Sequence, residues 1–189
     1  MGEQVNYTPA INALLKEKRL NPLGPGTPNE AARAQLAALT VESALAPETV
    51  KDQDMAAACL AGLWLYHDFI DQAHTICQDI DTPSGSYWHG IVHRREPDFD
   101  NAKYWFRRVG RHPIFEPLQL SAQELALAAK PDPSAAFLTT QSSWNPFAFI
   151  ELCAEVERRR SRSEQLCRQI QAREWELLFA FCFRAAVGK

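Results

Sequence analysis

The sequence lacks any long apolar run. No uninterrupted stretch of apolar residues exceeds seven members, the length of the one at positions 177–183, whereas a membrane-spanning helix needs about 20. The first residues also lack the basic and then apolar pattern of an export signal, because Glu3 and Asn6 stand where the apolar part would begin. We therefore expect no membrane partner, and we expect residues 177–183 to belong to a buried helix.

Paired cysteines are missing as well. The five cysteines are odd in number, and no two of them have the CxxC spacing of a zinc or redox site. Each lies among apolar neighbours in a helical pattern, which is typical of a buried free thiol. This cysteine usage favours a reducing compartment, so we expect a cytoplasmic location.

The chain has neither an excess of positive charge nor a familiar catalytic motif. Its formal net charge is −3 and its isoelectric point is about 6.0, so no nucleic-acid partner is expected. It contains no glycine-rich phosphate loop, no nucleophile elbow and no HExxH sequence. P-loop nucleotide-binding proteins, α/β-hydrolases and zincin-type proteases are therefore disfavoured.

Helix-forming patterns cover most of the chain. Hydrophobic residues make up 46% and charged residues 23%, as in globular domains, and no segment alternates with the period of two that marks a strand. We predict one all-α domain over residues 1–189, with N-terminal helices at 28–52, a central part at 53–112 and C-terminal helices at 113–189. Helices are expected at residues 9–15, 28–39, 54–66, 71–80, 87–96, 100–109, 114–129, 147–160 and 163–186, with loops at 21–28, 82–85 and 130–143.

The central part contains an internal repeat. The pattern DxAxxICxxI at residues 71–80 matches DxAxxWFxxV at residues 100–109, with a spacing of 29 residues. Each copy follows another helix, so the unit is a helix–turn–helix like those of tetratricopeptide (TPR) or Sel1 repeats. Because two copies are too few for a free-standing solenoid, we predict a compact helical bundle in which the flanking helices cap a TPR-like core of two helix–turn–helix units.

The candidate site lies in the helix expected at residues 87–96. All five histidines fall between residues 67 and 112, and on this helix His89, His93 and Glu96 share one face at the spacing HxxxHxxE. Such a face could hold a divalent metal ion, with His67, His74 or Glu96 as the third ligand. It could equally form an acid–base pair for a hydrolase-like reaction, or a purely structural network between helices.

A second hypothesis treats the same region as a binding groove. Repeat-like hairpins commonly form concave recognition surfaces, and Tyr87, His89, His93, Arg94 and Tyr104 are predicted to line one that takes a protein or small-molecule ligand. Arg94 and Arg95 point about 100° apart, so at most one of them can join the histidine face. One is expected to pair with Asp98 or Asp100, while the other could supply a fork for a carboxylate or phosphate. Trp144 either staples the helix that Asn145 caps or closes over the histidine face.

The longest distinctive run, YWHGIVHRREPDFDNAKYWFRRVGRHPIF at residues 87–115, resembles the signature of a family of uncharacterised proteins. The resemblance extends to HDFIDQAHTICQDIDTPSGS before this run and WNPFAFIELC after it, and covers residues 60–153 approximately. The family pattern has Trp-Asp-Pro-Phe where this chain has asparagine at position 145, so a carboxylate is missing here. The resemblance implies no activity, but it places in one signature His74, His89, His93, Arg94, Arg95, Glu96, Trp105 and Trp144.

Overall fold

The computed structural model describes residues 5–129, 131–159 and 161–189, and over these ranges the protein is all-α, as predicted. They form eleven α-helices and one 3-10 helix, without a strand. None of these helices is long and apolar enough to cross a bilayer. The helices are α1 (Pro9–Leu14), α2 (Glu30–Ala37), α3 (Val41–Leu45), α4 (Gln53–Tyr66), α5 (Ile70–Cys77), α6 (Pro83–Arg95), α7 (Phe99–Val109), α8 (Phe115–Ala129), η1 (Pro133–Ala135), α9 (Phe137–Thr140), α10 (Pro146–Arg159) and α11 (Glu164–Val187).

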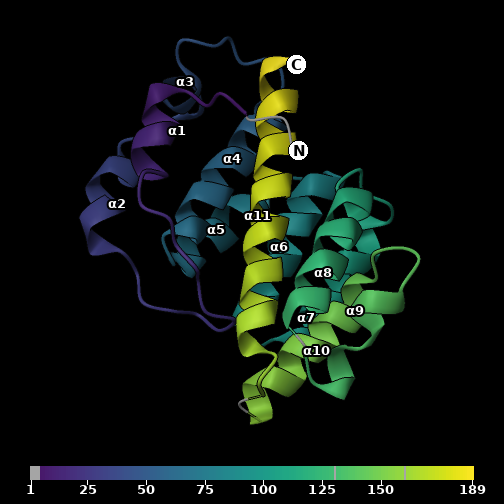
Figure 1. Ribbon diagram of the computed structural model, residues 1–189. Coiled ribbons are helices and arrows are strands. Elements are labelled where there is room, and N and C mark those ends of the chain that lie inside the picture. The colour runs from purple at the N-terminus through teal and green to yellow at the C-terminus, as the bar shows by residue number, and fades with distance from the viewer. Residues whose placement is uncertain (1–4, 130, 160) are drawn as a thin grey trace.

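Helix α6 lies at the centre of the molecule. Every residue from Ser84 to Arg95 is buried, because α4, α5 and α7 pack around this helix and α11 contacts it through Glu174. Figure 1 shows the long helix α11 in front of α4 and α6, with α1 to α3 on one side and α7 to α10 on the other. Polar side chains on α6 therefore meet other helices instead of bulk solvent.

Two glycines of α6 let other segments of the protein approach this helix closely. A Cβ atom on Gly85 would lie 2.3 Å from the carbonyl oxygen of Ile80, and one on Gly90 would lie 2.7 Å from the ring of Phe106. Thr82 caps the helix by accepting a hydrogen bond from the Gly85 amide, and Pro83 occupies the first helical position. The predicted break at residues 82–85 is thus wrong: these residues are the start of α6.

Other boundaries differ locally from the predicted ones. The helix expected at residues 28–39 is shorter in the structure: α2 runs from Glu30 to Ala37. The side-chain amide of Asn29 contacts Nδ1 of His67 at 3.1 Å instead of capping this helix. The loop expected at residues 130–143 contains η1 and α9. The predicted cap at Asn145 is confirmed, because its side chain accepts hydrogen bonds from the next two free amides of α10.

The interior consists of two hydrophobic clusters. The first surrounds α4, α5, α6 and the C-terminal half of α11, and the second joins α8, α9, α10 and the N-terminal part of α11. All five cysteines are free and buried within these clusters. Their burial agrees with the sequence pattern around each of them.

Candidate functional site

Successive residues of an α-helix point about 100° apart, so the polar side chains of α6 divide among three faces. Tyr87 and Arg94 face α11, Arg95 faces the end of α4, and His89 and His93 face α5 and α7. The residues predicted to line one groove therefore do not share a surface. Tyr104 is 47% exposed on α7, whereas the others are buried.

The face toward α11 carries a buried ion pair. Nη2 of Arg94 donates to Oε2 of Glu174 over 2.5 Å, and the hydroxyl of Tyr87 donates to Oε1 of the same carboxylate over 3.0 Å. The Arg94 guanidinium also lies over the ring of Phe149, 4.9 Å from its centroid. Burial lowers the pKa of Arg94, but the Glu174 carboxylate, together with Cys153 and Tyr87, outweighs burial, so the pKa is raised. The predicted pairing with Asp98 or Asp100 is wrong for this residue.

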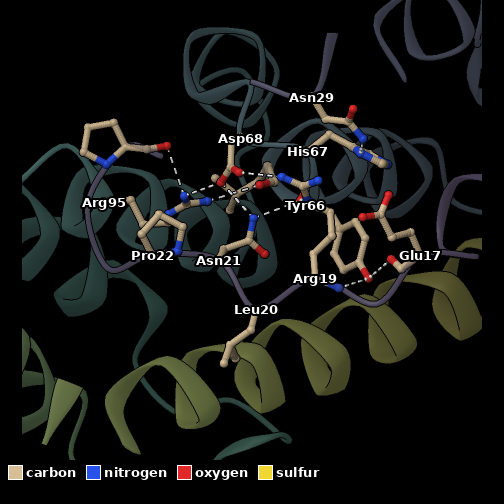
Figure 2. A network of polar contacts seen from close by, with 12 residues as sticks. Glu17, Arg19, Leu20, Asn21, Pro22, Asn29, Tyr66, His67, Asp68 and Arg95 are labelled. Atoms are coloured by element: carbon tan, nitrogen blue, oxygen red, sulfur yellow. Dashed lines mark hydrogen bonds and ion pairs between the residues drawn. The ribbon is translucent and has the colours of Figure 1, made fainter. Parts of the chain in front are cut away.

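Arg95 forms a clamp on the second face, and it too pairs elsewhere than predicted. Its Nε donates to the carbonyl oxygen of Gly24 over 3.2 Å, its Nη1 to that of Leu65 over 3.2 Å, and its Nη2 to Oδ1 of Asp68 over 2.5 Å. Asp68 also accepts a hydrogen bond of 2.9 Å from Arg19 (Figure 2). Because all three guanidinium nitrogens have partners, Arg95 fastens the segment before α2 to the end of α4.

The third face forms a cluster of three imidazoles. His89 and His93 stack with their ring centroids 4.7 Å apart, and His74 of α5 meets both rings edge-on, at 4.6 and 4.8 Å. One ring nitrogen from each histidine lies within 4.8 Å of the others. The structure thus confirms the helical face that carries His89 and His93, and it adds His74, one of the three residues considered as a further ligand.

Glu96, directly after α6, joins two of these imidazoles. Its Oε1 lies 3.2 Å from Nδ1 of His74, and its Oε2 lies 3.0 Å from Nδ1 of His93. The side-chain amide of Asn101, on α7, approaches Nε2 of His93 at 3.2 Å. The side chains of His74 and Glu96 are 31% and 27% exposed, so the cluster reaches solvent on their side.

His89 is the anomalous member of the cluster. It is only 3% exposed, and within the described residues neither of its ring nitrogens has a hydrogen-bond partner. Trp105 stacks on its ring, with the centroids 3.9 Å apart. Burial, with further contributions from His93 and His74, lowers the pKa of His89 to about 3, so the imidazole is neutral and keeps a free lone pair. A buried polar group without a partner costs about 1–3 kcal/mol, and this cost calls for an explanation.

The two remaining histidines have ordinary surroundings. The ring of His67 contacts the carbonyl oxygen of Leu14 at 3.1 Å as well as the Asn29 amide. The ring of His112 contacts the hydroxyl of Ser84 at 3.1 Å. Each is a buried histidine with hydrogen-bond partners, and neither belongs to the cluster.

Two tryptophans of the predicted signature lie in different places. Trp105, on α7, is partly exposed and covers His89. Trp144 packs against Phe149 in the second hydrophobic cluster, which supports the staple interpretation over closure of the histidine face. Sequence reasoning missed Asn101, because it lies eight residues after His93 on the next helix, and no helical spacing connects residues across the break between α6 and α7.

Comparisons with known proteins do not assign a function to this cluster. No protein-family model, curated protein or solved structure matches the chain.

Proposed function

We propose that this protein binds a divalent transition-metal ion, of the zinc class, through the imidazoles of His74, His89 and His93. The observation that carries the proposal is the buried His89 ring, whose nitrogens have no partner in the described residues while two other imidazoles stand beside it. A metal ion supplies the missing partner. In a purely structural network, by contrast, each buried nitrogen would be expected to have its own hydrogen bond.

The donor set suits such an ion. Neutral imidazole is a good ligand for zinc, copper, nickel and iron, and burial lowers the pKa of both His89 and His93, which favours their neutral forms. A tetrahedral site with Zn–N bonds of about 2.1 Å places its ligand nitrogens about 3.4 Å apart. Binding therefore draws the three rings together, with half-buried His74 free to move most, and displaces the Asn101 amide from His93.

The two central hairpins support a TPR-like interpretation of the core. Helices α4 and α5 pack as one pair, α6 and α7 as another, and α5 packs on α6. In that interpretation α4 and α6 are the inner helices, on which α11 lies through Arg94–Glu174 and through a 2.9 Å hydrogen bond from Trp175 to the Gly62 carbonyl. The surface that repeat proteins use for recognition is then covered by the chain itself, which favours the metal site over a scaffold role.

Metal analysis of the full chain, prepared without a histidine tag, tests the proposal. After incubation with zinc sulfate and removal of the excess, we expect about one equivalent of zinc in the wild type, as for any single structural or catalytic site. We expect almost none in His89→Gln. The matched control is His67→Gln, which alters a buried histidine outside the cluster and should keep the metal. Zinc-free wild type, or equal zinc in His89→Gln, would contradict the proposal.

A further inference from the structure

We infer that the ion held by the three histidines keeps one coordination position open, and that water or a small anion binds there from the side of His74 and Glu96. The inference rests on the proposed metal site. It concerns the role of Glu96, which the HxxxHxxE pattern suggests as a ligand but which the geometry assigns to positioning.

Both carboxylate oxygens of Glu96 are already engaged. Oε1 accepts a hydrogen bond from Nδ1 of His74 at 3.2 Å, and Oε2 lies 3.0 Å from Nδ1 of His93. With the proton of each ring held at Nδ1, the lone pair of each ring stands at Nε2, where a metal ion binds. Carboxylates that orient metal-binding histidines in this way are usual partners of such ligands. Glu96 therefore acts through the two imidazoles, and the protein supplies three ligands.

The other neighbouring side chains do not supply a fourth ligand. Asp98 lies on the same Nδ1 edge of His93, with its Oδ2 3.9 Å from that nitrogen. The thiol of Cys77 donates to the backbone carbonyl of His74, so it is engaged away from the imidazole nitrogens. Trp105 covers a ring face of His89 and offers no lone pair.

The open position faces solvent. His89 and His93 are only 3% and 5% exposed, whereas the partly exposed His74 and Glu96 side chains form the outer edge of the cluster. Three neutral imidazoles add no negative charge, and the Glu96 carboxylate behind two of them offsets only part of the double charge of the ion, which favours an anionic fourth ligand. Sites with three protein ligands and one exchangeable position bind water, lower its pKa and accept competing anions.

Visible absorption of the cobalt-loaded full chain tests the inference. Cobalt(II) replaces zinc in such sites, and its d–d bands report any change of ligand. Titration with sodium azide should shift these bands and saturate. A spectrum that does not change while cobalt stays bound would overturn the open position but not the metal site. Failure of the wild type to bind cobalt at all would overturn the metal site, so the two failures are distinguishable.

Variants at Glu96 separate positioning from ligation. Glu96→Gln should still bind cobalt and still respond to azide, with an affinity 10- to 100-fold lower, roughly the loss seen when partners of metal-binding histidines are removed. The control is Asp100→Asn, which changes an exposed carboxylate on α7 and should change neither property. If Glu96 is a ligand, the wild type will not respond to azide and Glu96→Gln will gain a response, which would contradict the inference.

Discussion

Arg95 and His89 are both buried on α6, six residues apart, but they differ in their hydrogen-bond partners. Each nitrogen of Arg95 donates a hydrogen bond to Asp68 or to a backbone carbonyl. His89, equally buried, has no partner for either nitrogen among the described residues. A polar group with a complete set of partners is explained by stability alone. For His89, which lacks them and stands beside two other imidazoles, we propose a bound metal ion, and this contrast distinguishes the structural clamp from the candidate site.

The largest expected effect is the loss of the clamp. Arg95→Met leaves the Asp68 carboxylate buried with weaker compensation and removes the donor to three carbonyl oxygens, those of Gly24, Pro25 and Leu65, so the free energy of unfolding should fall by about 3–5 kcal/mol. Urea denaturation followed by circular dichroism measures this loss. Arg159→Met is the control, because the Arg159 side chain is 77% exposed in its pair with Glu155, and it should have little effect. Similar losses in both variants would erase the distinction between the clamp and a surface pair.

The second-largest expected effect concerns His112, a buried histidine outside the cluster. It is a dependence of the free energy of unfolding on pH. Burial lowers the pKa of His112 from 6.5 to about 4. Below pH 6.5 the unfolded chain takes up a proton that the folded chain refuses, so the stability present above that pH is lost as the pH falls toward 4. The loss should approach about 3 kcal/mol.

Denaturation of the wild type and His112→Gln between pH 7 and pH 4.5 isolates this contribution. The difference in the free energy of unfolding between the two proteins should shrink as the pH falls. A constant difference would show that His112 titrates alike in the folded and unfolded chains.

Removing the Asn101 amide, which competes with a metal ion for His93, should strengthen metal binding. The Asn101 amide lies 3.2 Å from Nε2 of His93, the nitrogen assigned to the proposed metal ion. Asn101→Ala abolishes this hydrogen bond, which is worth about 0.5–1.5 kcal/mol, and should strengthen zinc binding roughly 2- to 10-fold. Titration calorimetry measures the gain, and weaker binding in this variant would mean that Asn101 helps to hold the ion.

The smallest change in the free energy of unfolding is expected for the substitution of His89. A histidine with a structural role would give a large change. His89→Phe, measured without metal, exchanges an imidazole that lacks partners for an apolar ring of similar shape. Its free energy of unfolding should stay within about 1 kcal/mol of the wild type. A loss of about 3 kcal/mol or more would show that His89 makes structural interactions after all.

The sequence was informative wherever the signal was local. Helix periodicity predicted most elements, and the spacing of four residues placed His89 and His93 on one face, because both features depend on neighbours within a turn or two. The start of α6 was missed because Thr82-Pro83-Ser84-Gly85 suits both a turn and a capped helix. Only the contact of Gly85 with Ile80 decides between them.

The partners of the two arginines lay beyond such local patterns. Glu174 is 80 residues from Arg94, and Asp68 is 27 residues from Arg95, so no spacing rule connects them. The run His93-Arg94-Arg95-Glu96 resembles a solvated surface, yet all but the last of these residues are buried. The small residues of α6 at positions 84, 85, 86 and 90 were the available sign of a helix enclosed on every side.

Thermal unfolding with and without zinc sulfate tests the central claim most directly. At a zinc concentration 100 times the dissociation constant, binding to the folded state adds about 2.7 kcal/mol, which for a chain of this size raises Tm by about 5–10 °C. The account predicts this rise for the wild type and none for His89→Phe. A wild type whose Tm does not rise, or an equal rise in His89→Phe, would contradict it.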